Sequence, residues 1–370
     1  MKILYTTNLP SPYRVDFWNL LSRDLEVTVI FERKKALDRD DKWQNNSPKR
    51  FKEVYCKGIS YGADSIISIT PLKYVFDKDI DLVIVGNATS VTGIIMVMLM
   101  KMFKVKYVVE GDGAFVKEGR ENLIKFWLKK TVISKALACL STCNNHDEYY
   151  LKYGAKEDSI YRYSFSSIHE KDILSTPISL DEKRYYREKL GIKEKRTVLY
   201  IGQFIYRKGC DILVDVARKL DNDIGVIMVG GNEFSADVKE MVGKLPTNVH
   251  IYPFMKPEEL KEFFLAADVF VLPTREDIWG LVVNEAMGYG VPVITTSMCN
   301  AGLELIKNDY NGMVVQSNSN SILEAIISIL NKPIDIYHMM QENALESMKY
   351  ATIERMVQDH RNIFSKLIDK

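Results

Sequence analysis

The chain has 370 residues, of which 46% are hydrophobic and 27% are charged. This composition is typical of a soluble globular protein and excludes a disordered chain, a collagen and a disulfide-stapled miniprotein. Lys and Arg total 50 and Asp and Glu total 49, so no strong overall field attracts nucleic acid. Because one hydrophobic core rarely grows to this size, we expect two domains.

Charge and cysteine content set the expected environment. Residues 1–175 carry 27 basic and 22 acidic side chains, so the first half is mildly basic and suits a surface near anionic groups. The five cysteines are odd in number and scattered, which favours a reducing compartment. The first apolar run ends at Asn8, and Val91–Phe103 is too short to cross a bilayer. We therefore expect a cytoplasmic protein that can reach the inner face of the membrane.

Short apolar runs alternate with helical patterns in the first half of the chain. Strands are predicted at Ile3–Thr7, Val27–Phe31, Leu82–Val85, Tyr107–Glu110 and Leu137–Leu140. The predicted helices between them are Tyr13–Leu21, Val91–Phe103, Asn122–Ser134 and Asn144–Tyr153. This alternation indicates a parallel sheet covered by helices on both faces.

The pattern breaks over residues 164–185, which we interpret as an interdomain linker, and then restarts. The later strands are predicted at Thr197–Ile201, Gly225–Val229, Val249–Tyr252, Val269–Leu272, Val291–Thr295 and Gly312–Val315. The later helices are predicted at Cys210–Leu220, Ala236–Leu245, Pro257–Ala267, Leu281–Tyr289 and Ser321–Leu330. The predicted fold class is α/β, with two Rossmann-like doubly wound domains, 1–175 and 176–350, facing across a cleft.

The segment Thr274–Thr296 contains the most informative pattern. After a predicted strand, Asp277 and Glu285 stand eight residues apart, with Trp279-Gly280 between them and a helix beginning at Leu281. The start of a helix presents unpaired N–H groups that suit a phosphate, and glycine lets the backbone approach closely. The two oxygens of Glu285 suit paired hydroxyls such as those of a ribose. An ordinary strand–loop–helix unit with surface carboxylates remains an equal alternative on spacing alone.

This segment resembles the C-terminal signature of retaining glycosyltransferases of the GT-B fold, in particular family 4. The signature has two Glu residues separated by seven, wrapped around Phe-Gly-Leu and followed by Glu-Ala-Met and Gly-x-Pro-Val-Ile. Here Gly280-Leu281, Glu285-Ala286-Met287 and Gly290-Val291-Pro292-Val293-Ile294 match, whereas Trp279 replaces Phe and Asp277 replaces the first Glu. The resemblance implies that Glu285 binds the nucleotide ribose and that Asp277 and the loop amides bind the sugar and diphosphate.

A second block agrees with the resemblance. Residues 199–211 read LYIGQFIYRKGCD, and Gly202, Lys208 and Gly209 match the family's Gly-Arg and Lys-Gly places, with Gln203 in the place of the Arg. Two cations facing a cleft suit a departing diphosphate, although these residues alone favour a solvated basic turn. The resemblance reverses that preference and implies that Arg207 and Lys208 are the leaving-group residues. Gly230-Gly231 resembles the family's next glycine-rich turn near the donor. The family often has Gly where Met255 stands, so UDP and GDP both remain open.

In the N-terminal half, which the resemblance makes the acceptor domain, two loops follow predicted strands. Arg14 ends the loop NLPSPYR, where facing the cleft and lying on the surface are equally plausible. Glu110 and Asp112 alternate with glycines at a strand end, so either is a candidate for holding hydroxyls, and Asp112 for taking the acceptor proton. The resemblance also implies that the last helix, within 351–370, packs back on the first domain.

The segment Asn122–Ala138 combines apolar residues with four lysines, Lys125, Lys129, Lys130 and Lys135. One interpretation is a helix that lies against anionic lipid and lets the enzyme reach a lipid-linked acceptor. The alternative, which the pattern favours, is a helix with one buried face and one solvated basic face.

Competing functions are weighed against this prediction. Asp38-Arg39-Asp40 and Asp79-Ile80-Asp81 do not follow strands, and the five histidines lack zinc spacing, so no catalytic metal or cofactor is predicted. A nicotinamide oxidoreductase would have Gly-x-Gly-x-x-Gly where NLPSPYR stands. A nucleotide-sugar epimerase and a non-catalytic two-domain sugar-binding protein remain as alternatives. The prediction is thus a retaining, metal-independent hexosyltransferase that uses a nucleotide sugar and a glycan or lipid-linked acceptor, in cell-surface polysaccharide synthesis.

Overall fold

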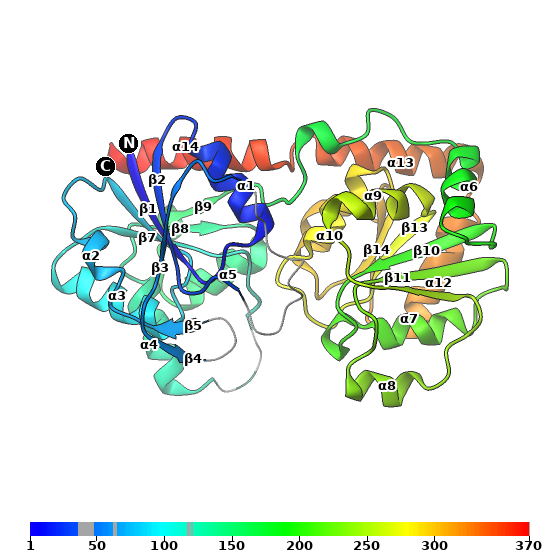
Figure 1. Ribbon diagram of the computed structural model, residues 1–370, viewed down its shortest axis with the longest axis horizontal. Helices are drawn as coiled ribbons and strands as arrows, with labels where there is room; N and C mark the ends of the chain where they lie inside the picture. Colours follow the sequence, from blue (N-terminus) through cyan, green and yellow to red (C-terminus); the bar gives the residue numbers. More distant parts are fainter. Residues whose placement is uncertain (36–47, 62–64, 117–118, 120, 370) are drawn as a thin grey trace. The chain divides into compact units, whose positions relative to one another are not determined.

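The structure is a computed structural model that describes residues 1–35, 48–61, 65–116, 119 and 121–369. The chain divides into two compact units (Figure 1). Unit 1 contains Met1–Phe165 and Ile353–Lys370, and unit 2 contains Ser166–Thr352. Each unit has its own sheet and its own buried core.

Unit 1 is built on a seven-stranded parallel sheet with the order β3-β2-β1-β6-β7-β8-β9. The strands are β1 (Lys2–Thr7), β2 (Glu26–Phe31), β3 (Lys52–Tyr55), β6 (Leu82–Val85), β7 (Tyr107–Glu110), β8 (Ala138–Ser141) and β9 (Ile160–Arg162), and β4 (Ile59–Tyr61) pairs separately with β5 (Ser65–Ile67). Strands β6, β7 and β8 are buried throughout, because both faces of the sheet are covered.

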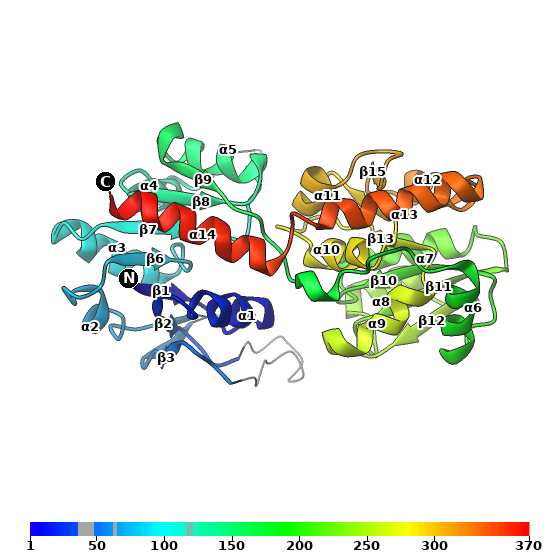
Figure 2. The same cartoon turned by 90° about the horizontal axis from the view of Figure 1, so that it is seen from above.

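The helices of unit 1 lie on both faces of this sheet. They are α1 (Pro12–Leu21), α2 (Leu72–Val75), α3 (Val91–Met102), α4 (Leu123–Ile133), α5 (Asn144–Lys152) and α14 (Ile353–Ile368). In Figure 1, α1 and α14 lie on one side of the sheet, and α3 and α4 lie on the other. Figure 2, seen from above, shows α14 in front of the sheet, where Phe364 is fully buried and contacts the ring of Tyr5.

Unit 2 is built on a six-stranded parallel sheet with the order β12-β11-β10-β13-β14-β15. Its strands are β10 (Arg196–Ile201), β11 (Ile224–Val229), β12 (Val249–Tyr252), β13 (Val269–Leu272), β14 (Val293–Thr296) and β15 (Gly312–Val315). Its helices are α6 (Leu180–Lys189), α7 (Cys210–Ala217), α8 (Ala236–Val242), α9 (Pro257–Ala266), α10 (Leu281–Gly288), α11 (Asn300–Leu305), α12 (Ser319–Leu330) and α13 (Ile334–Met348). The sheets therefore confirm the predicted α/β class with two Rossmann-like domains.

Each strand order reverses once, between β1 and β6 in unit 1 and between β10 and β13 in unit 2. At such a reversal the loops that follow the two strands run in opposite directions and leave a crevice at the carboxyl edge of the sheet. This geometry singles out the residues after β10 and β13, which are the two segments that the sequence analysis favours.

The sequence analysis did not predict β3, β4, β5, β9, α2, α6, α11 or α13. Strands β3 and β9 lie at the two edges of the seven-stranded sheet and have no fully buried residue. Helix α6 begins inside the predicted linker, after a capping box between Ser179 and Glu182. Its buried positions are Lys183 and Arg187, so the apolar period that signals a helix is missing. The two charges are accommodated by the carbonyl groups of Ala266 and Ala267 and the carboxylate of Asp268.

Candidate functional site

The loop after β10 packs directly against the residue that follows β13. It forms a short turn, η4 (Tyr206–Lys208), and then Gly209 in the left-handed region with φ of 71°. A Cβ on Gly209 would lie 2.0 Å from the carbonyl oxygen of Pro273. Only glycine permits both this conformation and this close approach, so the glycine predicted from the family pattern has a structural cause.

Hydrogen bonds centred on Arg207 join the two loops. Its carbonyl oxygen accepts from the backbone N–H of Arg275 at 2.9 Å and from the hydroxyl of Thr274 at 3.0 Å. Its guanidinium donates to the carbonyl oxygen of Glu276 at 2.8 Å, and the Arg207 side chain lies at an exposed position. The structure therefore brings together the two blocks that the sequence placed about 70 residues apart.

Lys208 and Asp277 form an ion pair that the sequence analysis did not anticipate. The ammonium of Lys208 donates to Oδ2 of Asp277, and both side chains are largely buried, with exposures of 16% and 12%. The backbone N–H of Asp277 donates to the carbonyl oxygen of Met298 at 2.8 Å, which fixes the loop. The cation proposed for a diphosphate thus already has a carboxylate partner, and the carboxylate orients its ammonium.

A second pair, also missed from the sequence, holds the turn η4 against the loop after β13. The guanidinium of Arg275 donates to both oxygens of Asp211, at 2.8 and 2.6 Å, and lies 3.8 Å from the centre of the Tyr206 ring. Such bidentate hydrogen bonds fix the orientation of a planar guanidinium. Arg275 sits two residues before Asp277, so a basic residue in this loop was visible in the sequence, but its partner was not.

Trp279 and Gly280 shape the start of α10. Trp279 is buried, and its indole N–H donates to Oδ1 of Asn284 at 2.9 Å. Gly280 has φ of 95°, and a Cβ there would lie 2.6 Å from the sulfur of Cys299. The first backbone N–H groups of a helix have no partner within the helix, so Gly280-Leu281 offers donors at the end of the helix dipole that attracts anions.

Glu285 lies within α10 and is partly buried. Burial raises the pKa of its carboxyl to about 7, and the hydroxyl of Ser167, which donates to Oε1 at 2.7 Å, opposes this rise only in part. Ser167 comes from the segment before α6 and was not predicted. A carboxyl with this pKa exchanges its proton near neutrality, so it can both accept and donate hydrogen bonds to hydroxyl groups.

The glycines after β10 and β11 support a close backbone contact. Gly230 has φ of 143°, and a Cβ on it would lie 2.1 Å from the carbonyl oxygen of Gly202. Gly231 follows it beside the Phe204 ring, and the carbonyl oxygen of Gln203 accepts from the hydroxyl of Tyr200 at 2.9 Å. The loops after β10 and β11 therefore pack backbone against backbone at the carboxyl edge of the sheet, with the Gln203 side chain exposed.

In unit 1 the structure gathers Arg14, Glu110 and Asp112 into one cluster. Arg14 is only 8% exposed, and its guanidinium pairs with Oε1 of Glu110 and, at 2.5 Å, with Oδ1 of Asp112. The alternative that Arg14 is a surface residue is therefore wrong, because the two carboxylates draw it into the sheet end. Asp112 keeps a partly exposed carboxylate, whose other oxygen accepts from the Tyr13 hydroxyl at 2.7 Å.

Helix α14 adds His360 to this cluster. Its Nε2 lies 3.3 Å from Oε1 of Glu110, and its Nδ1 donates to the carbonyl oxygen of Met356 at 2.7 Å. Burial alone would raise the pKa of Glu110, but Arg14 and His360 outweigh it and lower the pKa to about 2. The carboxylate is therefore ionised at neutral pH. His360 stands 250 positions from Glu110 in the chain, so no local pattern could have indicated it.

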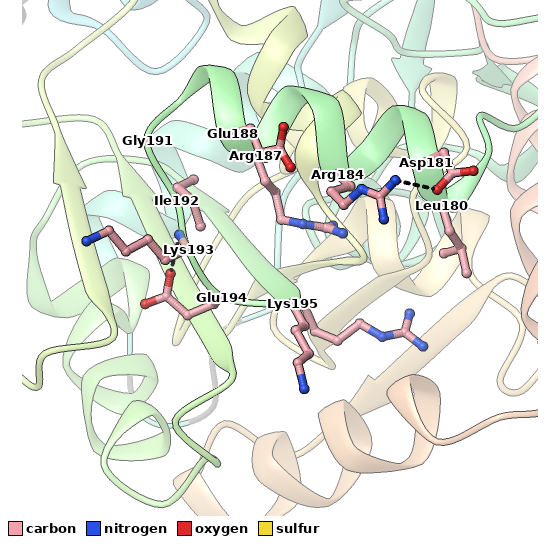
Figure 3. A pocket seen from close by; sticks show the side chains of 11 residues that line it. Leu180, Asp181, Arg184, Arg187, Glu188, Gly191, Ile192, Lys193, Glu194 and Lys195 are labelled. Atoms are coloured by element: carbon pink, nitrogen blue, oxygen red, sulfur yellow. Dashed lines mark hydrogen bonds and ion pairs between the residues drawn. The ribbon is translucent and has the colours of Figure 1, made fainter.

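A separate surface hollow of about 730 Å³ lies beside α6 and the first residue of β10 (Figure 3). It is lined by Arg184, Arg187, Lys193, Glu194 and their neighbours, and Arg184 is paired there with Asp181. The start of β10 is the edge of the sheet opposite to the one that carries the loops described above. Parallel α/β sheets bind ligands at the carboxyl edge, so this hollow is not the candidate site.

The acidic pairs considered for a metal have other surroundings. Asp81 accepts from the backbone N–H of Lys2 at 2.7 Å, and Asp79 pairs with the Lys2 ammonium, so both lie at the amino ends of β1 and β6. Asp38-Arg39-Asp40 lies outside the described residues. Over the described parts of the chain, no group of three or more His, Cys, Asp or Glu residues is arranged to hold a metal. Among the described helices, none is long and apolar enough to cross a membrane.

Comparison with known proteins gives the family context. The family model described as Glycosyl transferases group 1 matches residues 182–347. An uncharacterized 41.2 kDa protein of the cps region of Klebsiella pneumoniae is 30% identical over 207 residues, which are 55% of this chain and 57% of the relative. The N,N'-diacetylbacillosaminyl-diphospho-undecaprenol alpha-1,3-N-acetylgalactosaminyltransferase of Campylobacter jejuni is 21% identical over 79% of both chains. The chain spans about half the length of the first curated relatives it matches.

Solved structures are similar to this chain over nearly its whole length. The Anabaena protein HepE, crystallised in complex with UDP and glucose, superposes with a TM-score of 0.78 and 14% identity, over 99% of this chain and 100% of its own. The chain therefore has the GT-B fold of the glycosyltransferases, with a group 1 domain at residues 182–347.

Proposed function

We propose that this GT-B protein is a retaining glycosyltransferase of family 4, which moves a sugar from a nucleotide-diphosphate sugar to a glycan or lipid-linked acceptor. The observation that carries the proposal is the joined pair of loops after β10 and β13. They hold Arg207, the Lys208–Asp277 pair and the start of α10 together at the reversal point of the sheet, within the group 1 domain.

Unit 2 is the proposed donor-binding unit. The donor's diphosphate would lie at the backbone N–H groups of Gly280 and Leu281, close to the Lys208 ammonium. Glu285 would hold the two ribose hydroxyls, and Gly202, Gln203, Gly230 and Gly231 would line the backbone surface under the nucleotide. UDP and GDP are the proposed nucleotides, and the bound UDP of the Anabaena neighbour supports the first.

The proposed chemistry is leaving-group assistance without a metal or a cofactor. The bond between the sugar's anomeric carbon and the diphosphate oxygen breaks, and negative charge develops on the diphosphate. Arg207 and Lys208 stabilise that charge, while Asp277 orients the ammonium of Lys208 and contacts the sugar. The acceptor hydroxyl forms the new bond on the face that the diphosphate leaves, so the anomeric configuration is retained.

Unit 1 is the proposed acceptor-binding unit. Its Asp112 carboxylate, which is partly exposed, is proposed to take the proton of the acceptor hydroxyl, and Arg14 and Glu110 fix its position. The name of the Campylobacter relative includes a diphospho-undecaprenol-linked sugar, which supports a lipid-linked acceptor here. The cps region of the Klebsiella relative supports a role in cell-surface polysaccharide synthesis at the cytoplasmic face of the membrane.

The test is a donor screen with the full chain and UDP-, GDP- and ADP-linked sugars. Transfer or slow hydrolysis should release nucleoside diphosphate. Replacing the ammonium in Lys208→Ala should raise the barrier by about 2–4 kcal/mol, the scale of one lost charge-stabilising contact. Lys189→Ala removes an exposed ammonium paired with Glu262 in the same unit and should leave the rate unchanged. An unchanged rate in a folded Lys208→Ala protein would remove this residue from the mechanism.

A further inference from the structure

The first two turns of α4 expose large apolar side chains. Leu123 is 75% exposed, Ile124 70% and Trp127 59%. Residues at positions i, i+1 and i+4 share one face of a helix, so these three form a continuous apolar surface. Only Val132 and Ile133, near the end of the helix, are buried. The apolar residues near the end of α4 thus lie in the core, whereas those in its first two turns lie on the surface.

Lysines surround this apolar face, and no acidic residue lies within α4. Lys125 is exposed, and the Lys130 ammonium lies 5.2 Å from the centre of the Trp127 ring. Lys129 differs, because its ammonium pairs with Glu121 at 2.6 Å just before the helix. Lys130 therefore places a positive charge on this face next to the tryptophan, and Lys125 flanks the face one position after Ile124.

Helix α3 packs beside α4. The Lys101 ammonium donates to the carbonyl oxygen of Thr131 at 3.0 Å, which places the last turn of α3 alongside the end of α4 (Figure 1). Met98, one turn earlier on α3, is 51% exposed. The helix packed beside α4 thus also exposes an apolar side chain.

We propose that this α4 face, formed by Leu123, Ile124, Trp127 and Lys130 and flanked by Lys125, docks on an anionic lipid bilayer. Tryptophan favours the membrane–water interface, apolar side chains enter the headgroup region, and lysines attract anionic headgroups. A second copy of the chain fits less well, because pairing two such faces would bring lysines against lysines.

The position of α4 connects docking with the lipid-linked acceptor, and to that extent the inference rests on the proposed function. Strand β7 ends at Glu110, and α4 is the helix that returns the chain from β7 to β8. In a parallel sheet such a helix begins at the carboxyl edge, so the start of α4 and the Glu110–Asp112 cluster lie at the same edge of the sheet of unit 1. A bilayer under this face would present its lipids near the residues proposed to bind the acceptor.

The test is co-sedimentation of the full chain with vesicles of phosphatidylcholine alone or mixed with phosphatidylglycerol. We expect binding to the mixed vesicles, weak binding to phosphatidylcholine, and loss of binding as NaCl is raised. Lys125→Glu with Lys130→Glu should weaken binding at least about tenfold, since each basic residue near the surface contributes about fivefold. Leu123→Ser with Ile124→Ser and Trp127→Ser should also abolish it. These exposed positions are not needed for the core, and a thermal unfolding curve checks this.

A matched control lies on α8 of unit 2, where Lys239 and Met241 are also exposed. Lys239→Glu with Met241→Ser should leave vesicle binding unchanged. The proposal would be overturned if the wild type bound neither vesicle, or if the α4 variants bound as well as the wild type. It would also be overturned if the wild type formed a dimer that the variant with Leu123, Ile124 and Trp127 replaced by Ser does not form. Vesicle binding uses no substrate, so it is independent of donor turnover: a protein that docks but releases no nucleoside diphosphate loses only the proposed function.

Discussion

Two carboxylates of unit 2 show how the surroundings of a residue set its chemistry. Asp277 is largely buried against the ammonium of Lys208, whereas Glu285 accepts a hydrogen bond from the neutral hydroxyl of Ser167. Burial raises the pKa of Glu285 to about 7, and the Ser167 hydrogen bond opposes this rise only in part. A charge that is held for a ligand rather than for the fold is expected to have this kind of environment.

Burying the Glu285 carboxylate should lower the stability of the protein in a way that depends on pH. The pKa rises from 4.5 to about 7 on folding, so wild-type stability is greatest below the lower value and falls as the pH rises through the higher one. Glu285→Gln has no charge to bury, so it should be more stable than wild type by about 3 kcal/mol at about pH 9 and nearly equal at about pH 4. Urea unfolding at both pH values measures this. Glu258→Gln, at an exposed position of α9, is the control, and a gain that does not depend on pH would contradict the argument.

Glu110 should behave in the opposite way. Arg14 and His360 lower its pKa to about 2, so its contribution to stability is present above 4.5 and is lost as the pH falls toward about 2. Glu110→Gln leaves the Arg14 guanidinium buried with one carboxylate fewer, which should cost about 3–5 kcal/mol at neutral pH. Glu53→Gln is the control. Glu53 is 39% exposed and pairs with Lys49, so breaking this ion pair should lower the stability by about 1 kcal/mol or less. Equal effects in chemical unfolding would refute this interpretation of the cluster.

At the scale of the element, the start of α10 depends on a glycine. Gly280 has φ of 95°, and the sulfur of Cys299 occupies the place of a Cβ. Gly191, after α6, has a similar φ of 74°, but nothing lies within 4 Å of its Cβ position. A side chain at either position would strain the backbone, but only one at Gly280 would also collide with another atom.

Substitution by alanine should separate the two costs. Gly191→Ala should lower the free energy of unfolding by only about 1–2 kcal/mol, because alanine disfavours the left-handed backbone conformation. Gly280→Ala should lose more, by roughly 1–3 kcal/mol, because the loop must also move away from Cys299. It should also weaken nucleotide binding, since the N–H groups at the helix start would shift. Thermal unfolding and nucleotide titration measure both effects, and equal losses at the two glycines would rule out the collision.

The elements also show what sequence patterns can and cannot reveal. Strands β10 and β13 were predicted because Val198–Ile201 and Val269–Leu272 are uninterrupted apolar runs, and the motif placed Trp279, Gly280 and Glu285 at the helix that follows β13. Partners that are distant in sequence were not accessible: the Lys208–Asp277 pair spans 69 positions and the Glu110–His360 contact spans 250. Helix α6 was missed because it buries Lys183 and Arg187 instead of apolar side chains.

At the scale of the whole molecule, unit 2 is one uninterrupted segment of chain, whereas unit 1 is completed by α14. Helix α14 buries Phe364 and brings His360 to Glu110, and α1 packs against it. We therefore expect the folding of unit 1 to require α14, and the folding of unit 2 to require no segment outside residues 166–352.

We expect residues 166–352, expressed alone, to unfold cooperatively and to bind UDP or GDP as tightly as the full chain does. Residues 1–165 alone should be markedly destabilised, because the loss of Phe364 alone removes about 3–5 kcal/mol of packing. Circular dichroism during urea unfolding and calorimetric nucleotide titration measure both properties. A stable fragment 1–165, or a fragment 166–352 that does not fold, would contradict this division.

The most direct test of the donor site is hydrogen–deuterium exchange of the full chain with and without UDP or GDP. The account predicts slower exchange at residues 202–209, 230–231 and 277–285, where the loops after β10, β11 and β13 meet at the carboxyl edge of the sheet. Protection at residues 180–196 around the hollow beside α6 instead, or no protection by any nucleoside diphosphate, would contradict it.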